Sequence, residues 1–221
     1  MLRDGTVFDA PQGVNVLRVV TPVFHKRVYT PRGFEIRPDD TVVDVGANIG
    51  AFAVYAAQRT RGRVLAVEPH PGNADALRRN LRANGAERAE VAECAVADAP
   101  GTLPLFLGTS GTTHQLFAVG KDAGAGESVD VRVVTFSELL AEHGFPRVDF
   151  LKLDCEGAEG LILPGLPDAV LGAIRTIAME FHDDVSPLAH DALAKLLEEK
   201  GFRTALAWDG RSANGMLFGT R

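Results

Sequence analysis

From residue 41 onward, short apolar runs alternate with segments of helical periodicity, and no other feature of the sequence constrains the fold as much. Each apolar run is long enough for one buried strand, and each intervening segment is long enough for a helix. In such units the strands lie parallel, because the crossover between them is right-handed and lays its helix on the sheet. The sequence therefore predicts an α/β fold with a mostly parallel sheet and helices on both faces.

The expected elements follow from this alternation. Strands are predicted at about 41–45, 63–68, 88–94, 150–154 and 176–181, and helices at about 49–59, 71–84, 136–143 and 187–200. Two further extended segments, near 103–107 and 129–134, flank a glycine-rich loop at 108–128. This loop is either a lid that orders when ligands bind or a disordered surface loop. A hairpin turn at Asp209-Gly210 predicts one antiparallel strand at the C-terminal side of the sheet.

The chain of 221 residues is expected to form one catalytic domain, 39–221, preceded by an N-terminal elaboration, 1–38. Extended character around 14–20 and 23–29 predicts that 1–38 form a strand-rich cap or lid. An apolar share of 46% is enough to bury a sizeable core without disulfides. The two cysteines are far apart and lack metal-ligand spacing, which favours reduced thiols.

The net charge of −6 argues against a broad nucleic-acid surface, because counterion release needs clustered lysines and arginines. The first residues lack the apolar region of a secretory signal, and no run approaches the length that spans a bilayer. We therefore expect a cytoplasmic location and a small-molecule partner, with no nucleic-acid or membrane partner. The oligomeric state is left open.

The loop after the first predicted strand suggests the kind of ligand. Gly46 and Gly50 are separated by three residues, and Asn48 stands where a dinucleotide fingerprint would have a further glycine. The Gly-Lys-Ser/Thr of a phosphate-binding P-loop is also absent. Instead Asp44 lies at the strand end, where its charge would repel a pyrophosphate and attract the ammonium and sulfonium of S-adenosylmethionine. Gly46 is expected to let the backbone come close to that ligand.

Glu68 ends the second predicted strand. An acid at this place can accept hydrogen bonds from both ribose hydroxyls of a nucleotide-like ligand. Taken alone, Asp44 would serve equally well as a helix cap and Glu68 as a solvated strand end. Together, at two successive strand ends, they favour a nucleoside site.

Three stretches of the sequence resemble the FkbM family of methyltransferases. They are 42–50 (VVDVGANIG), 66–71 (AVEPHP) and 150–159 (FLKLDCEGAE), and the resemblance covers about 34–183. It implies a class I methyltransferase (Rossmann-like) fold with a seven-stranded sheet. It also implies S-adenosylmethionine as cofactor, S-adenosylhomocysteine as product, and O-methylation of a hydroxyl or carboxyl on a natural product, sugar or related metabolite. Thr112 and Thr113 follow Gly111 where family members often carry paired serines.

The residues expected to bind the cofactor lie in the loops after the first strands and at the end of the fourth. They are Asp44, Gly46, Asn48, Gly50, Glu68, Pro69, Ala95, Val96 and Asp154.

The expected catalytic residues are Asp154, His182 and Glu180, at the ends of the fourth and fifth predicted strands. Asp154 shares a strand face with Lys152 and should lie near the methyl group, although it could equally cap the following helix. His182 is expected to be the general base, because its ordinary pKa suits proton removal near neutrality. Glu180, two residues earlier, would orient the imidazole.

The same region admits a metal. Asp154, Glu180, His182, Asp183 and Asp184 offer oxygen and nitrogen ligands to Mg²⁺, which could lower the pKa of an acceptor hydroxyl. The spacing does not define a ligand geometry, so the sequence favours the metal-free alternative.

Three rival functions remain. The fold could serve a nicotinamide-dependent oxidoreductase, against which the missing glycine fingerprint speaks. It could also be a nucleotide-binding module without turnover. An RNA or protein methyltransferase is the third, but no Asn-Pro-Pro-Tyr-type motif follows the fourth strand, which disfavours an amino-group acceptor on a base or glutamine.

Overall fold

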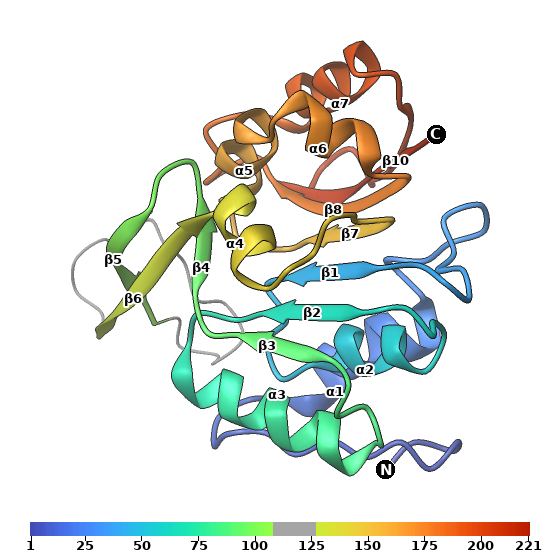
Figure 1. Ribbon diagram of the computed structural model, residues 1–221, viewed down its shortest axis with the longest axis vertical. Coiled ribbons are helices and arrows are strands. Elements are labelled where there is room, and N and C mark those ends of the chain that lie inside the picture. The colour runs from blue at the N-terminus through green and yellow to red at the C-terminus, as the bar shows by residue number, and fades with distance from the viewer. Residues whose placement is uncertain (108–126) are drawn as a thin grey trace.

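The computed structural model describes residues 1–107 and 127–221, which are arranged around one seven-stranded sheet (Figure 1). Its strand order is β3-β2-β1-β7-β8-β10-β9. The bounds are β1 (Val42–Val45), β2 (Val64–Val67), β3 (Glu90–Ala92), β7 (Phe150–Leu153), β8 (Thr176–His182), β9 (Arg203–Ala207) and β10 (Asn214–Thr220). Strand β10 runs antiparallel to both β8 and β9, and the pairs on the other side of β8 are parallel. The predicted α/β fold with one antiparallel strand is confirmed.

Helices cover both faces of this sheet, because successive strand residues point to opposite sides. Val43 and Val45 of β1 belong to one apolar core, which they share with the helices α4 (Phe136–Glu142), α5 (Glu159–Gly165), α6 (Asp168–Ala173) and α7 (His190–Glu199). Val42, between them, faces a second core with α2 (Ala51–Ala57) and α3 (Pro71–Ala83). Figure 1 shows the two groups of helices above and below the strands. The class I arrangement expected from the resemblance is therefore present.

A second, three-stranded sheet was not anticipated as a unit. It consists of β4 (Ala95–Ala97), β5 (Gly101–Phe106) and β6 (Ser128–Thr135), in the order β4-β6-β5. In Figure 1 it lies beyond the carboxyl ends of β1 and β2. The two extended segments predicted near 103–107 and 129–134 are its strands β5 and β6. Most of the predicted loop at 108–128, with Gly111, Thr112 and Thr113, lies outside the described residues.

The N-terminal segment corrects one expectation, because it is helical where a strand-rich cap was predicted. It contains α1 (Val16–Thr21) and the π-helical turn η1 (Pro22–Lys26), and no strand is found in 1–38. The side chain of Asn15 caps α1, and the buried Val20 and Val23 lie three residues apart, a helical spacing. The β-branched residues of this segment favour a strand by local preference. Packing of Val20 and Val23 against the core around α2 stabilises the helical conformation instead. The domain boundary at residue 38 stays a prediction.

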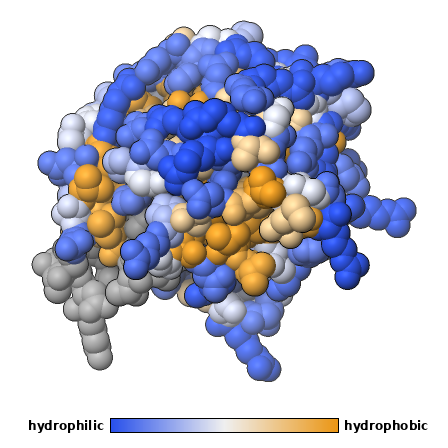
Figure 2. All heavy atoms as spheres, turned by 90° about the horizontal axis from the view of Figure 1, so that it is seen from below, coloured by the Kyte–Doolittle hydropathy of each residue, from blue (hydrophilic) through white to orange (hydrophobic). Residues whose placement is uncertain are grey.

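The face that carries α3 and the N-terminal segment is mostly hydrophilic, with a smaller hydrophobic area near its middle (Figure 2). Within 1–107 and 127–221, no helix combines the length and the apolar character that crossing a bilayer would require.

Candidate active site

Two adjoining cavities open at the carboxyl ends of the central strands, where β1 lies between β2 and β7 and the strand order reverses. The first encloses about 620 Å³ of space not filled by atoms, including open solvent at its mouth. The second is larger and lies between the N-terminal segment and β7, β8 and β10. Gly46, Asn48, Asp154 and Glu156 line both. A ligand in one cavity can therefore contact a ligand in the other.

The loop after β1 is held in an unusual backbone conformation. Gly46 has a φ of +78°, and a Cβ there would lie 1.7 Å from the carbonyl oxygen of Asp154. The glycine was expected to admit a ligand, but the group that comes closest is the neighbouring strand end. Gly50 begins α2 with a φ of +88°, and a Cβ there would lie 2.4 Å from Leu77 Cδ1. Gly50 lines neither cavity, so its role is to let α2 pack on α3.

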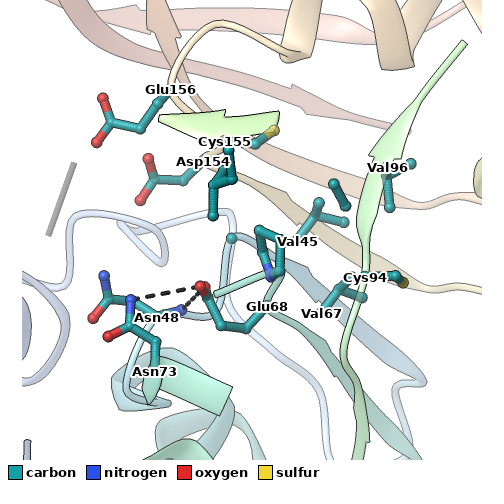
Figure 3. A pocket seen from close by; sticks show the side chains of 14 residues that line it. Val45, Asn48, Val67, Glu68, Asn73, Cys94, Val96, Asp154, Cys155 and Glu156 are labelled. Carbon is teal, nitrogen blue, oxygen red and sulfur yellow. Dashed lines mark hydrogen bonds between the residues drawn. The ribbon is translucent and has the colours of Figure 1, made fainter. Parts of the chain in front are cut away.

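Glu68 presents a fixed, buried carboxylate to the first cavity. Its side chain accepts hydrogen bonds from the backbone N–H groups of Asn48 (2.8 Å) and His70 (2.9 Å). Figure 3 shows Glu68 facing the side chain of Asn73, whose amide nitrogen lies 3.5 Å from Oε1. Burial raises the pKa of Glu68 to about 7, although these hydrogen bonds lower it.

The first cavity has a polar side and an apolar side. Figure 3 shows Asp154 and Glu156 above Glu68, with Val67 and Val96 across from them. The predicted cofactor residues that line it are Gly46, Asn48, Glu68, Pro69, Ala95, Val96 and Asp154. Asn73 was missed, since nothing in the sequence of α3 distinguishes it.

Asp44 does not line either cavity. It is completely buried beside Lys152, which is 2% exposed and lies opposite it in the β1–β7 register. Lys152 Nζ stands 2.9 Å from Asp44 Oδ1 and donates to the carbonyl of Gly46 at 2.8 Å. Burial raises the pKa of Asp44, and although burial alone would lower the pKa of Lys152, Asp44 and Asp154 raise it. The expected direct contact of Asp44 with a cofactor is thus replaced by an internal ion pair.

Asp154 is held by a residue from the N-terminal segment. The hydroxyl of the buried Tyr29 donates to Asp154 Oδ2 at 2.7 Å and lies 3.5 Å from Glu180 Oε2. Lys152 Nζ lies 3.6 Å from the same Asp154 oxygen. Helix α5 starts only at Glu159, so Asp154 does not cap this helix, which was the alternative role expected for it. Sequence reasoning missed Tyr29, because no motif marks it.

Beyond Asp154 the chain makes a tight turn that Glu159 fixes. The completely buried Glu159 accepts from the backbone N–H groups of Cys155 (2.7 Å) and Gly157 (2.9 Å). Between them, Glu156 has a φ of +52°, in the left-handed region that a residue with a Cβ rarely adopts.

His182 stands between two carboxylates. Its Nδ1 lies 3.4 Å from Glu159 Oε1 and its Nε2 lies 3.6 Å from Glu156 Oε2. Burial alone would lower the pKa of His182, but Glu159, Asp154 and Glu156 raise it to about 10. The imidazole is then protonated near neutral pH, which argues against the expected role as a base.

Glu180 is a further acid that lines the second cavity. Burial and the nearby Asp154 raise its pKa to about 7, and Asn214 donates to Glu180 Oε1 at 3.2 Å. The predicted trio of Asp154, Glu180 and His182 is therefore brought together at one cavity. Asp183 is not part of it, since it lies 2.6 Å from His190 Nδ1, and Asp184 is exposed.

Comparison with known proteins gives concordant matches. The sequence profile of the methyltransferase FkbM domain matches residues 44–204. The 31-O-demethyl-FK506 methyltransferase FkbM of Streptomyces tacrolimicus is 32% identical over 85% of this chain and 82% of its own length. The AMB antimetabolite synthetase AmbE of Pseudomonas aeruginosa is 32% identical over 86% of this chain, which spans only 11% of that synthetase. The crystal structure of a methyltransferase FkbM from Methylobacillus flagellatus superposes with a TM-score of 0.58 at 16% identity, over 91% of this chain and 48% of that one.

Proposed function

Because the chain belongs to the FkbM family of methyltransferases, we propose that it transfers the methyl group of S-adenosylmethionine to a hydroxyl oxygen of a small metabolite. The observation that carries the proposal is the junction of the two cavities at Asp154 and Glu156. A nucleoside cofactor in the first cavity and an acceptor in the second would meet there. The name of the Streptomyces relative refers to a 31-O-demethyl substrate, which supports an oxygen acceptor.

The residues of the first cavity fit the cofactor that the family and fold imply. The Glu68 carboxylate, which backbone N–H groups hold in place, can accept hydrogen bonds from ribose hydroxyls. Ala95 and Val96 offer an apolar surface to a base, and Asp154 offers negative charge to a cationic end. When bound, S-adenosylmethionine supplies a methyl group activated by a sulfonium.

Glu180 is the general base of this proposal. A carboxylate with a pKa of about 7 is half ionised near neutrality and can take a hydroxyl proton, which typically accelerates a reaction by about 10²–10⁴-fold. Tyr29 and Asn214 hold the Glu180 side chain at the cavity floor. His182, the base expected from the sequence, is not the base of this proposal, because the neighbouring acids raise its pKa to about 10.

The acceptor would be small and partly apolar. The second cavity combines its acidic floor with an apolar wall from the N-terminal segment, formed by Val19, Pro22, Val23 and Val28. Arg18 and Lys26 also line it and would favour an acceptor that carries a negative group. These features suit a metabolite with a hydroxyl at one end and an apolar or acidic body.

The test is methyl transfer from S-adenosylmethionine carrying a ¹³C-labelled methyl group to a panel of hydroxylated metabolites, including sugar acids and hydroxylated natural products. Formation of S-adenosylhomocysteine would report turnover, and the ¹³C chemical shift of the product would identify the methylated atom. We expect an O-methyl product. A methyl group on nitrogen or carbon would refute the oxygen assignment while leaving the methyltransferase family intact.

A further inference from the structure

We propose that Asp154, Glu156 and His182 form a binding site for one divalent cation of the Mg²⁺ or Mn²⁺ type, at the junction of the two cavities. The role of this cation in catalysis rests on the proposed function, because it would orient the acceptor hydroxyl. The binding site itself rests only on the geometry of the three side chains.

The three residues converge from two neighbouring strands. Asp154 and Glu156 follow β7, and His182 ends β8, which pairs with β7 in parallel. Each offers one ligand atom, and these atoms lie within 4.8 Å of one another. Two carboxylates and one imidazole suit a cation that accepts oxygen and nitrogen ligands, and three protein ligands leave further positions for water or an acceptor.

His182 is oriented as a metal-binding histidine. Its Nδ1 is buried, has no hydrogen-bond partner within 1–107 and 127–221, and lies 3.4 Å from Glu159 Oε1. Glu159 is in turn fixed by the backbone N–H groups of Cys155 and Gly157. Ligating histidines usually direct the second ring nitrogen to such a carboxylate, which leaves the other nitrogen for the metal. Here that other nitrogen is Nε2, which faces Glu156. A cation bound at Nε2 would displace the proton that this nitrogen carries when the imidazole is charged.

The two acids are also positioned for a ligand. Glu156 adopts a left-handed backbone conformation, a strain that tends to persist at functional sites. Asp154 uses Oδ2 to accept from Tyr29, so its other oxygen, Oδ1, remains for a cation.

The charge around the site is predominantly negative. Asp154, Glu156, Glu159 and Glu180 surround it, and the nearby ammonium of Lys152 is already paired with Asp44. A divalent cation would offset these carboxylates and lower the pKa of a bound hydroxyl. In the transfer, the O–H bond would break with its proton passing to Glu180, while the O–CH₃ bond forms and the S–CH₃ bond breaks.

The experiment measures Mn²⁺ binding to chelator-treated protein, without substrate, by calorimetry and by loss of the free Mn²⁺ electron paramagnetic resonance signal. We expect one Mn²⁺ per chain, and binding weakened by about tenfold or more in His182→Asn and in Glu156→Gln. Asp184→Asn is the matched control, because this exposed acid lies two residues from His182 outside the cluster. Its affinity should equal that of the wild type.

The outcomes separate this site from the proposed function. His182 does not line the first cavity, so His182→Asn should retain S-adenosylhomocysteine binding while losing Mn²⁺. Absence of Mn²⁺ binding to the wild type at about 1 mM, or equal affinity in all three variants, would overturn the site. If Mn²⁺ binds but no methyl group is transferred to any oxygen, the proposed function fails and the cation site stands.

Discussion

Lys152 Nζ lies 2.9 Å from Asp44 Oδ1 across the β1–β7 pair, and both side chains are buried. The same ammonium bonds the carbonyl of Gly46 and stands 3.6 Å from Asp154. One lysine therefore links the strand core to the loop and the acid that line both cavities. A buried pair of this kind is costly to break from one side, because the remaining charge is left without a partner.

We expect Lys152→Met to destabilise the fold by about 3–5 kcal/mol, since Asp44 would be buried unpaired. The double variant Asp44→Leu/Lys152→Met should recover at least half of the loss, because it removes both charges. Urea denaturation of the four proteins of the cycle measures these differences. As a control, Asp39→Ala breaks the exposed pair with Arg61 and should cost about 1 kcal/mol or less. Equal losses in the single and double variants would contradict the pairing.

Gly46→Ala should destabilise the protein far more than a positive φ alone explains. Gly46 and Gly210 have φ values of +78° and +74°, but only at Gly46 would a Cβ meet another group, the carbonyl of Asp154. Gly210→Ala is therefore the matched control and should cost about 1–2 kcal/mol. Gly46→Ala should cost more and should also weaken binding of S-adenosylhomocysteine. The two losses are compared by thermal and urea denaturation, and similar values would remove the steric explanation.

Binding of S-adenosylhomocysteine should weaken as the pH falls through about 7. The ionised Glu68 carboxylate accepts the ribose hydroxyls in our proposal, and burial raises its pKa to about 7, so acid converts it to the poorer acceptor. Between pH 8 and pH 6 the affinity should drop by about tenfold. Calorimetry at both values tests this. Glu68→Gln should bind weakly with little pH dependence, and an unchanged pH dependence in this variant would assign the effect to another group.

Tyr29→Phe should lower kcat by about tenfold to a hundredfold, the loss of a charge-assisted hydrogen bond of about 1.5–3 kcal/mol. The variant releases Asp154 Oδ2, and Tyr29 lines only the second cavity, so affinity for S-adenosylhomocysteine should be retained. Tyr55→Phe is the control, because the Tyr55 hydroxyl bonds Thr30 away from both cavities. Steady-state kinetics distinguish the two. Similar kcat values for both variants would mean that Tyr29 acts on stability alone.

Glu180→Gln should lower turnover at neutral pH by about 10²–10⁴-fold if Glu180 is the base. In the wild type the carboxylate must be ionised, so the rate should rise with pH through about 7 and then level off. The variant should lose this rise. A wild-type pH profile in Glu180→Gln would transfer the role of base to another residue.

The strand ends could be predicted from the sequence because charged residues interrupt or close apolar runs there, as at Glu68 and Asp154. The pairing of Asp44 with Lys152 could not be predicted, because the register of β1 against β7 is set by the whole sheet. Tyr29 lies 125 residues from Asp154 in the chain, and only the packed structure brings them together. The helical conformation of α1 could not be predicted for a related reason. Its valines prefer a strand locally, and burial against α2 overrides that preference.

Strand β10 follows β9 in the chain but lies between β8 and β9, and Asn214, Gly215 and Met216 of β10 line the second cavity. As the chain leaves the ribosome, the outer edge of β8 stays unpaired until β10 has emerged. Every wall of the first cavity comes from residues up to Glu156. All residues that line the first cavity are therefore synthesised before the β10 residues that complete the lining of the second.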